Sequence, residues 1–133
     1  LLEGVIKAKD IPAIWNESYL NYLEVKVPDD RQGCLQDVHW SHGSFGYFAT
    51  YSIGSLYAAQ MHAAILQVHP SLLSEVAEGN KGNVSAWLQQ HIYPYGRYYT
   101  SGELCRKATG QPLSSHFFID YATTKYKEIY ERS

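Results

Sequence analysis

The feature that most limits the fold of this sequence is a long run without acidic side chains, lysine or arginine. No Asp, Glu, Lys or Arg occurs from Val38 to Ser74. A transmembrane helix needs about 20 consecutive, mostly apolar residues, and serine, glycine, glutamine and histidine interrupt this run too often for that. The run is instead typical of a helix buried inside a larger protein, and we expect no membrane span.

Helical signals on both sides of the run predict an all-α fold. Asp10 as a cap and Pro12 in the first turn mark one helix, which the 27–30 turn ends. The 31–43 stretch has no clean period and is predicted as a loop, and a long helix is predicted over 44–68. Shorter helices are expected over 71–78, from an Asn83 cap onward, from a Thr100–Glu103 capping box to Gly110, and from a cap at Ser114 or Ser115. Residues 1–133 are therefore predicted to form a single all-helical unit.

Composition excludes several classes of function. Hydrophobic residues make up 45% of the 133 residues, which excludes a disordered segment. The formal net charge of −2 leaves no basic footprint for nucleic acid. The two cysteines, Cys34 and Cys105, are too few for a disulfide framework and are typical of thiols in a reducing, cytoplasmic compartment. The sequence opens on Leu1 with no initiator Met and no signal peptide, so we expect it to be cut from something longer.

The candidate chemistry lies in the predicted loop and at the start of the long helix that follows. The loop carries an amide, Gln36, a carboxylate, Asp37, and two imidazoles, His39 and His42. Asp37 and His39 are two residues apart and share a face of an extended segment. A carboxylate beside an imidazole orients the ring and stabilises its protonated form.

Each candidate residue also has a structural interpretation. Tyr47 and Tyr51 are four residues apart and point their hydroxyls to the same side of a helix, but such tyrosines are usually core residues. His39 and His42 suit loop hydrogen bonds as well as metal binding. No further cluster at ligand spacing accompanies them, so we expect no metal site from this chain alone. Cys34 has no recognisable orienting group for a nucleophile. Composition and spacing therefore predict a helical domain with one polar loop as its candidate site.

Residues 33–40 read Gly-Cys-Leu-Gln-Asp-Val-His-Trp and resemble the Gly-x-x-Gln-Asp-x-His-Trp signature of the thermostable carboxypeptidase 1 family. These proteins are zinc metallocarboxypeptidases of the Taq carboxypeptidase type. The similarity continues over 41–60, at 2–4, 23–24, 87–88, 96–97, 103–104 and 108–110. The sequence departs from the family at Ala49, where the family usually has Pro, and at Tyr93, where it often has His.

The resemblance spans nearly all of this chain but only the C-terminal portion of the family's usual length. The family's metal site is a His-Glu-x-x-His helix with a downstream Glu, and the His-Glu-x-x-His pattern does not occur here. The resemblance therefore implies that the zinc, its ligands and the general-base Glu belong to the remainder of the enzyme. We expect this chain alone to bind no metal and to be inactive.

The resemblance also implies roles for two sets of residues in an enzyme that releases C-terminal amino acids from peptides with a zinc-activated water. The first set is implied to bind the substrate's C-terminal end, with the carboxylate as the orienting group: Gln36, Asp37 and His39. The second set is implied to be catalytic by binding the tetrahedral intermediate: His42, Tyr47 and Tyr51.

The alternative is a non-catalytic helical module used for dimerisation or partner binding. The resemblance implies a homodimer, and the aromatic residues Tyr121, Tyr126 and Tyr130 suit such a contact. The expected partners are thus a peptide substrate, the remainder of the enzyme and a second copy, with no nucleic acid and no membrane. A His-Glu-x-x-His pattern in the reading frame upstream would favour the enzyme.

Overall fold

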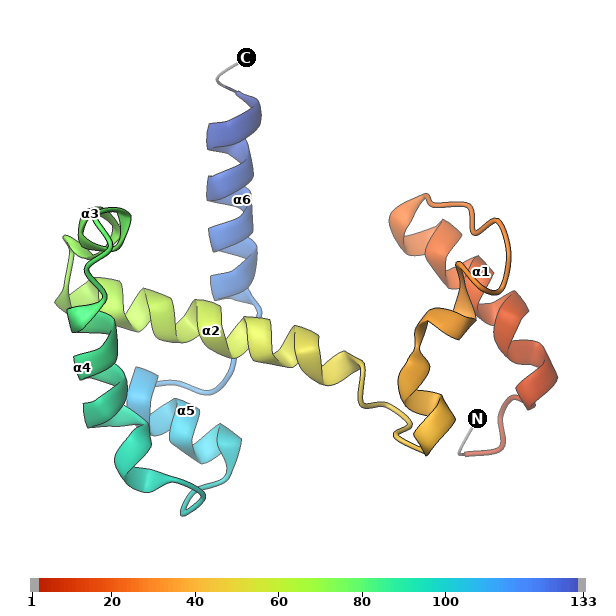
Figure 1. Ribbon diagram of the computed structural model, residues 1–133, viewed down its shortest axis with the longest axis horizontal. Coiled ribbons are helices and arrows are strands. Elements are labelled where there is room, and N and C mark those ends of the chain that lie inside the picture. The colour runs from red at the N-terminus through yellow and green to blue at the C-terminus, as the bar shows by residue number, and fades with distance from the viewer. Residues whose placement is uncertain (1–2, 132–133) are drawn as a thin grey trace. The chain divides into compact units, whose positions relative to one another are not determined.

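The computed structural model describes residues 3–131, and over that range the regular structure is entirely helical (Figure 1). This confirms the predicted all-α class. The residues pack as two compact units, Leu1–Phe48 and Ala49–Ser133. The expectation of one all-helical unit over 1–133 stays a prediction. Within the described range, no helix has both the length and the apolar character needed to cross a bilayer.

The first unit is built on helix α1. Its helical elements are η1 (Ala8–Asp10), α1 (Ile11–Leu23), η2 (Cys34–Gln36) and η3 (Val38–His42). Asp10 occupies the N-cap position of α1 but makes no side-chain cap. Its carboxylate instead accepts a hydrogen bond from the backbone N of Lys7 at 2.9 Å and closes η1, so the predicted cap position is confirmed but the side chain does not cap α1. Glu24, in a left-handed conformation with φ of 56°, ends α1 before the predicted turn.

The segment predicted as a loop contains the two short 3-10 helices η2 and η3, and it packs on α1. Cys34 at the start of η2 is buried. Trp40 of η3 meets Trp15 of α1 edge to face, with 6.1 Å between the ring centroids. The polar residues of the candidate site are therefore carried on short helical turns fixed to a longer helix.

The second unit is built around the long helix α2. Its elements are α2 (Ala49–Val68), α3 (Leu72–Ala77), α4 (Gly82–His91), η4 (Tyr93–Tyr95), α5 (Ser101–Thr109) and α6 (His116–Tyr130). Helices α5 and α6 both pack on α2 (Figure 1). Ile65, Leu72 and Trp87 form a buried apolar cluster contributed by α2, α3 and α4. The long helix begins at Ala49 rather than at Ser44, because Gly46 has a φ of 76° and interrupts a helical backbone.

A buried amide connects α2 to the segment between α5 and α6. Gln60 of α2 is 1% exposed. Its Nε2 donates to Thr109 Oγ1 at 2.8 Å, and also to the carbonyl oxygens of Gln111 at 3.2 Å and Pro112 at 3.1 Å. Its Oε1 accepts a hydrogen bond from the backbone N of Ser114 at 2.9 Å. Both ends of the amide are thus satisfied by a segment that is distant in sequence.

The predicted helix caps had mixed outcomes. The Thr100–Glu103 capping box is confirmed, and Gly110 ends α5 in a left-handed conformation with φ of 82°. The Asn83 cap is wrong, because α4 begins at Gly82 and Asn83 lies inside it. At the start of α6, Ser115 occupies the N-cap position without a side-chain bond. The Ser114 hydroxyl accepts a hydrogen bond from the His116 backbone instead.

Asn83 links two helices through the carboxylate of Glu75. Ser71 Oγ donates to Glu75 Oε1 at 2.6 Å, and Asn83 Nδ2 donates to Glu75 Oε2 at 2.7 Å. The hydrogen bonds from Ser71 and then Asn83 hold the pKa of Glu75 below its ordinary value. The link therefore stabilises the fold above the unfolded-state pKa of about 4.3 and is lost as the pH falls through the lower folded-state pKa.

Asn83→Ala is expected to lower the urea midpoint of unfolding at pH 7, because it removes one donor from the ionised carboxylate of Glu75. The difference from the wild type should shrink once the pH is below the folded-state pKa of Glu75. Gln90→Ala, which removes an exposed amide from the same helix, is the control and should have little effect at either pH. An equal loss for Asn83→Ala at neutral and acidic pH would show that the carboxylate is not the relevant partner.

Candidate functional site

The centre of the candidate site is a hydrogen-bonded pair formed by Asp37 and His39. Asp37 is the N-cap of η3, and its Oδ1 accepts a hydrogen bond from the backbone N of His39 at 3.2 Å. The same oxygen lies 2.8 Å from His39 Nδ1. The two side chains are 8% and 14% exposed. The cap therefore places a shielded carboxylate against one nitrogen of the ring. The two residues pair, but through a 3-10 turn, and the predicted extended segment is wrong.

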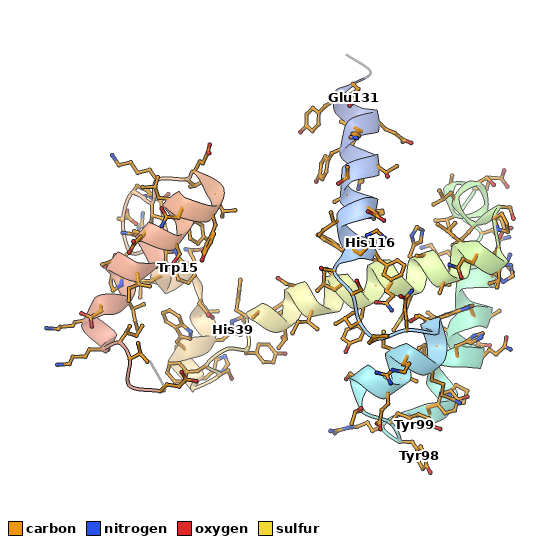
Figure 2. All side chains as sticks on the ribbon, turned by 180° about the vertical axis from the view of Figure 1, so that it is seen from behind. Trp15, His39, Tyr98, Tyr99, His116 and Glu131 are labelled. Atoms are coloured by element: carbon orange, nitrogen blue, oxygen red, sulfur yellow. The ribbon has the colours of Figure 1, made fainter. Side chains whose placement is uncertain are left out.

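Aromatic rings surround His39. Its ring centroid lies 5.1 Å from that of Tyr47, 5.2 Å from that of Phe48 and 5.9 Å from that of His42. Figure 2 labels His39 in the segment that follows α1. Two residues predicted as catalytic, His42 and Tyr47, thus share the surroundings of a residue predicted to bind substrate. Phe48 was missed by the sequence analysis, because an apolar ring nine residues away gives no local signal of contact with an imidazole.

The predicted helical pairing of Tyr47 and Tyr51 is wrong. Tyr47 precedes α2, and its backbone N donates to the carbonyl oxygen of Ser44 at 3.4 Å. Tyr51 lies in the first turn of α2 and belongs to the second unit. The two tyrosines therefore do not lie on one helix, and the spacing does not align their hydroxyls. The catalytic roles of both tyrosines stay predictions.

Two other polar side chains are held by their own loop. Gln36 Nε2 donates to the carbonyl oxygen of Arg31 at 2.6 Å, a contact that spacing did not reveal. His42 Nδ1 lies 3.0 Å from Ser44 Oγ. Gln36 and His42 flank the Asp37–His39 pair in the sequence. These contacts restrict the rotamers of the Gln36 and His42 side chains.

The described residues offer no donor set for a metal ion. Within 3–131, no group of three or more His, Cys, Asp and Glu side chains lies close enough together to hold one. The two cysteines, Cys34 and Cys105, are free thiols and are buried. The imidazole, amide and phenol groups near the Asp37–His39 pair can supply hydrogen bonds.

Comparison with known proteins identifies the class. The family model of the carboxypeptidase Taq (M32) metallopeptidases matches residues 1–126, and the chain therefore belongs to this family. The membership confirms the resemblance read from residues 33–40.

Individual relatives match this chain over nearly its whole length. The chain is 38% identical over 121 residues to thermostable carboxypeptidase 1 of Pyrococcus furiosus, covering 91% of this chain and 24% of that protein. It is 34% identical over 130 residues to carboxypeptidase 1 of Bacillus subtilis, covering 98% of this chain and 26% of that protein. It matches the crystal structure of the M32 carboxypeptidase from Deinococcus radiodurans R1 with a TM-score of 0.89 at 36% identity, covering 98% of this chain and 26% of that one. The chain thus spans about a quarter of the length of these relatives.

Proposed function

We propose that the full-length protein is a zinc-dependent metallocarboxypeptidase that releases C-terminal amino acids from peptides. Membership of a metallopeptidase family and the carboxypeptidase names of its relatives support this proposal. The observation that carries this chain's own part is the Asp37–His39 pair. The residues described here do not fit a zinc ion, so we assign the metal and its ligands to the remainder of the enzyme.

The Asp37–His39 pair suits capture of a peptide's C-terminal carboxylate. A protonated imidazole donates through both ring nitrogens, and Asp37 accepts from Nδ1. In the proposal, Nε2 donates a charge-assisted hydrogen bond to the carboxylate of the substrate. Gln36 has two amide N–H donors, one of which bonds to Arg31, and we assign the other to the same carboxylate. Asp37 is the orienting group and does not touch the substrate.

We assign His42, Tyr47 and Tyr51 to the tetrahedral intermediate. A hydrogen bond from a phenol or imidazole to the developing oxyanion stabilises the transition state more than the bound substrate. The contacts of the Tyr47 and His42 rings with the ring of His39 support the assignment of these two residues, whereas that of Tyr51 rests on the family resemblance. Tyr47 is also half-exposed, so a substrate can reach it.

We further propose that the complete enzyme is a cytoplasmic homodimer. Tyr126 and Tyr130 stack on each other along α6, with 6.1 Å between ring centroids, and at 54% and 72% exposed they offer an aromatic face for a second copy. Tyr121, which is 45% exposed, lies on another side of α6, with its ring 6.1 Å from that of His62 on α2. Two buried free thiols are typical of a reducing compartment. The same exposed tyrosines support the alternative, a non-catalytic helical module that binds a partner.

The test compares the full-length protein with the 133-residue chain. We expect the full-length protein to hold stoichiometric zinc, to trim a peptide with a free C-terminus faster than the same peptide amidated, and to lose this activity to a chelator. The 133-residue chain should show neither zinc nor trimming, and elemental analysis with mass spectrometry of the products measures both. A zinc-loaded full-length protein that trims no peptide would favour the non-catalytic module. A zinc-loaded and active 133-residue chain would contradict the assignment of the metal site to the remainder.

A further inference from the structure

Gly33 lies close to its neighbours, just before the segment that carries the Asp37–His39 pair. A Cβ atom at Gly33 would lie 2.7 Å from Val27 Cγ1 and 3.1 Å from the carbonyl oxygen of Asp29. It would also lie 3.4 Å from Asn16 Oδ1 of α1. A contact of 2.7 Å is too short for two carbon atoms, and close-packed surroundings transmit the resulting strain. An added methyl group must therefore displace the segment, its neighbours or both.

The other glycines of the described range differ from Gly33 in this respect. Gly82 would meet only the end of the Asn80 side chain, at 3.1 Å, and a Cβ at Gly54 or Gly102 would meet nothing within 4 Å. Among the described glycines, a Cβ at Gly33 would thus contact both a backbone oxygen and a branched side chain. Its lack of a side chain permits the close approach.

Backbone hydrogen bonds close the turn that leads from Gly33 to Asp37. The backbone N of Gly33 donates to the carbonyl oxygen of Asp30 at 3.2 Å, and its own carbonyl oxygen accepts from the backbone N of Gln36 at 2.9 Å. Asp37 N then donates to the carbonyl oxygen of Cys34 at 3.4 Å. Cys34, between them, is only 3% exposed and is therefore closely packed. A displacement at Gly33 is therefore passed along η2 to the carboxylate that holds His39.

We propose that Gly33 is a positioning residue for the Asp37–His39 pair. The close packing of Gly33 on Val27 and Asp29 sets the position from which the Asp37 carboxylate orients the imidazole. The kinetic consequence rests on the proposed function, since it requires that His39 bind the substrate carboxylate. The geometric consequence does not, since it concerns only the hydrogen bond between Asp37 and His39.

The kinetic test uses Gly33→Ala in the full-length enzyme with a peptide that has a free C-terminus. A displaced carboxylate-binding group weakens binding of substrate and transition state alike, so we expect KM to rise roughly three- to tenfold with little change in kcat. Val27→Ala combined with Gly33→Ala removes the 2.7 Å contact but keeps the 3.1 Å contact, and should fall between Gly33→Ala and the wild type. Gly102→Ala on α5 is the control and should leave KM unchanged.

The geometric test follows the Nδ1–H proton of His39 by NMR of enzyme labelled with 15N-histidine. His39→Ala identifies the signal by removing it. We expect Gly33→Ala to shift the signal and the double variant to shift it less. An unshifted signal in both variants overturns the proposal, even if either variant melts at a lower temperature. A graded shift without any loss of activity in His39→Ala would refute the carboxylate role of His39 and leave the positioning role of Gly33 intact.

Discussion

His39→Ala in the full-length enzyme is expected to lower kcat/KM between roughly tenfold and more than a hundredfold on a peptide with a free C-terminus. The substitution removes one charge-assisted hydrogen bond to the terminal carboxylate, which is worth about 1.5–3 kcal/mol of transition-state stabilisation. It also leaves the mostly buried carboxylate of Asp37 without its imidazole partner. Zinc content should be unchanged, because the proposed function assigns the metal ligands to the remainder of the enzyme.

The deciding comparison for His39 is the same peptide with an amidated C-terminus. A residue that binds the carboxylate should lose most of its effect on the amidated peptide. His116→Ala is the matched control, because His116 also pairs with an aspartate, Asp120 at 3.0 Å, but its side chain is 69% exposed. An equal loss on both peptides, together with a lower melting temperature, would show that His39 only ties its loop together.

Gln60→Leu is expected to lower the free energy of unfolding by about 3–5 kcal/mol, because it removes several hydrogen bonds at once from a shielded position. The carbonyl oxygens of Gln111 and Pro112 and the backbone N of Ser114 each lose their amide partner. The leucine gains no polar contact in return. Urea unfolding followed by circular dichroism measures the loss.

Two further variants identify the cause of that loss. Gln60→Glu keeps the shape of the side chain but presents an oxygen to the carbonyl oxygens of Gln111 and Pro112. Burial and these oxygens should raise the pKa of the introduced carboxyl in the folded state, so its penalty should ease as the pH falls. Gln67→Leu, on the exposed part of the same helix, should cost little. A loss at Gln60 no larger than that at Gln67 would contradict the role of the buried amide.

Local signals predicted a helix correctly where residues close in the sequence determine the backbone conformation. The Thr100–Glu103 capping box and Gly110 define α5 because their hydrogen bonds and backbone angles lie within a few residues of each other. The start of the long helix was predicted too early, because its apolar pattern continues upstream through the turn at Gly46. The Asn83 cap was predicted wrongly, because the partner of Asn83 is Glu75, which belongs to another helix and gives no local signal.

The candidate site was predictable to the same extent. The spacing of Asp37 and His39 indicated their pairing, because a residue two positions ahead of an imidazole can reach its ring. The packing of Phe48 on His39 depends on the path of the intervening chain. The close approach at Gly33 depends on where Val27 and Asp29 are placed by the preceding turn. Tertiary contacts of this kind leave no period or motif in the sequence.

The hydrogen bond from the backbone N–H of Ser114 to Gln60 makes the exchange of this proton sensitive to the position of α2. The N–H of Ser114 donates to a side chain 54 residues earlier in the sequence rather than to a carbonyl oxygen of a nearby turn. Its exchange with deuterium requires Gln60 to leave its position, so it measures a joint opening of α2 and the α5–α6 connection. A slow Ser114 amide that becomes fast in Gln60→Leu would show that these segments open as one cooperative unit.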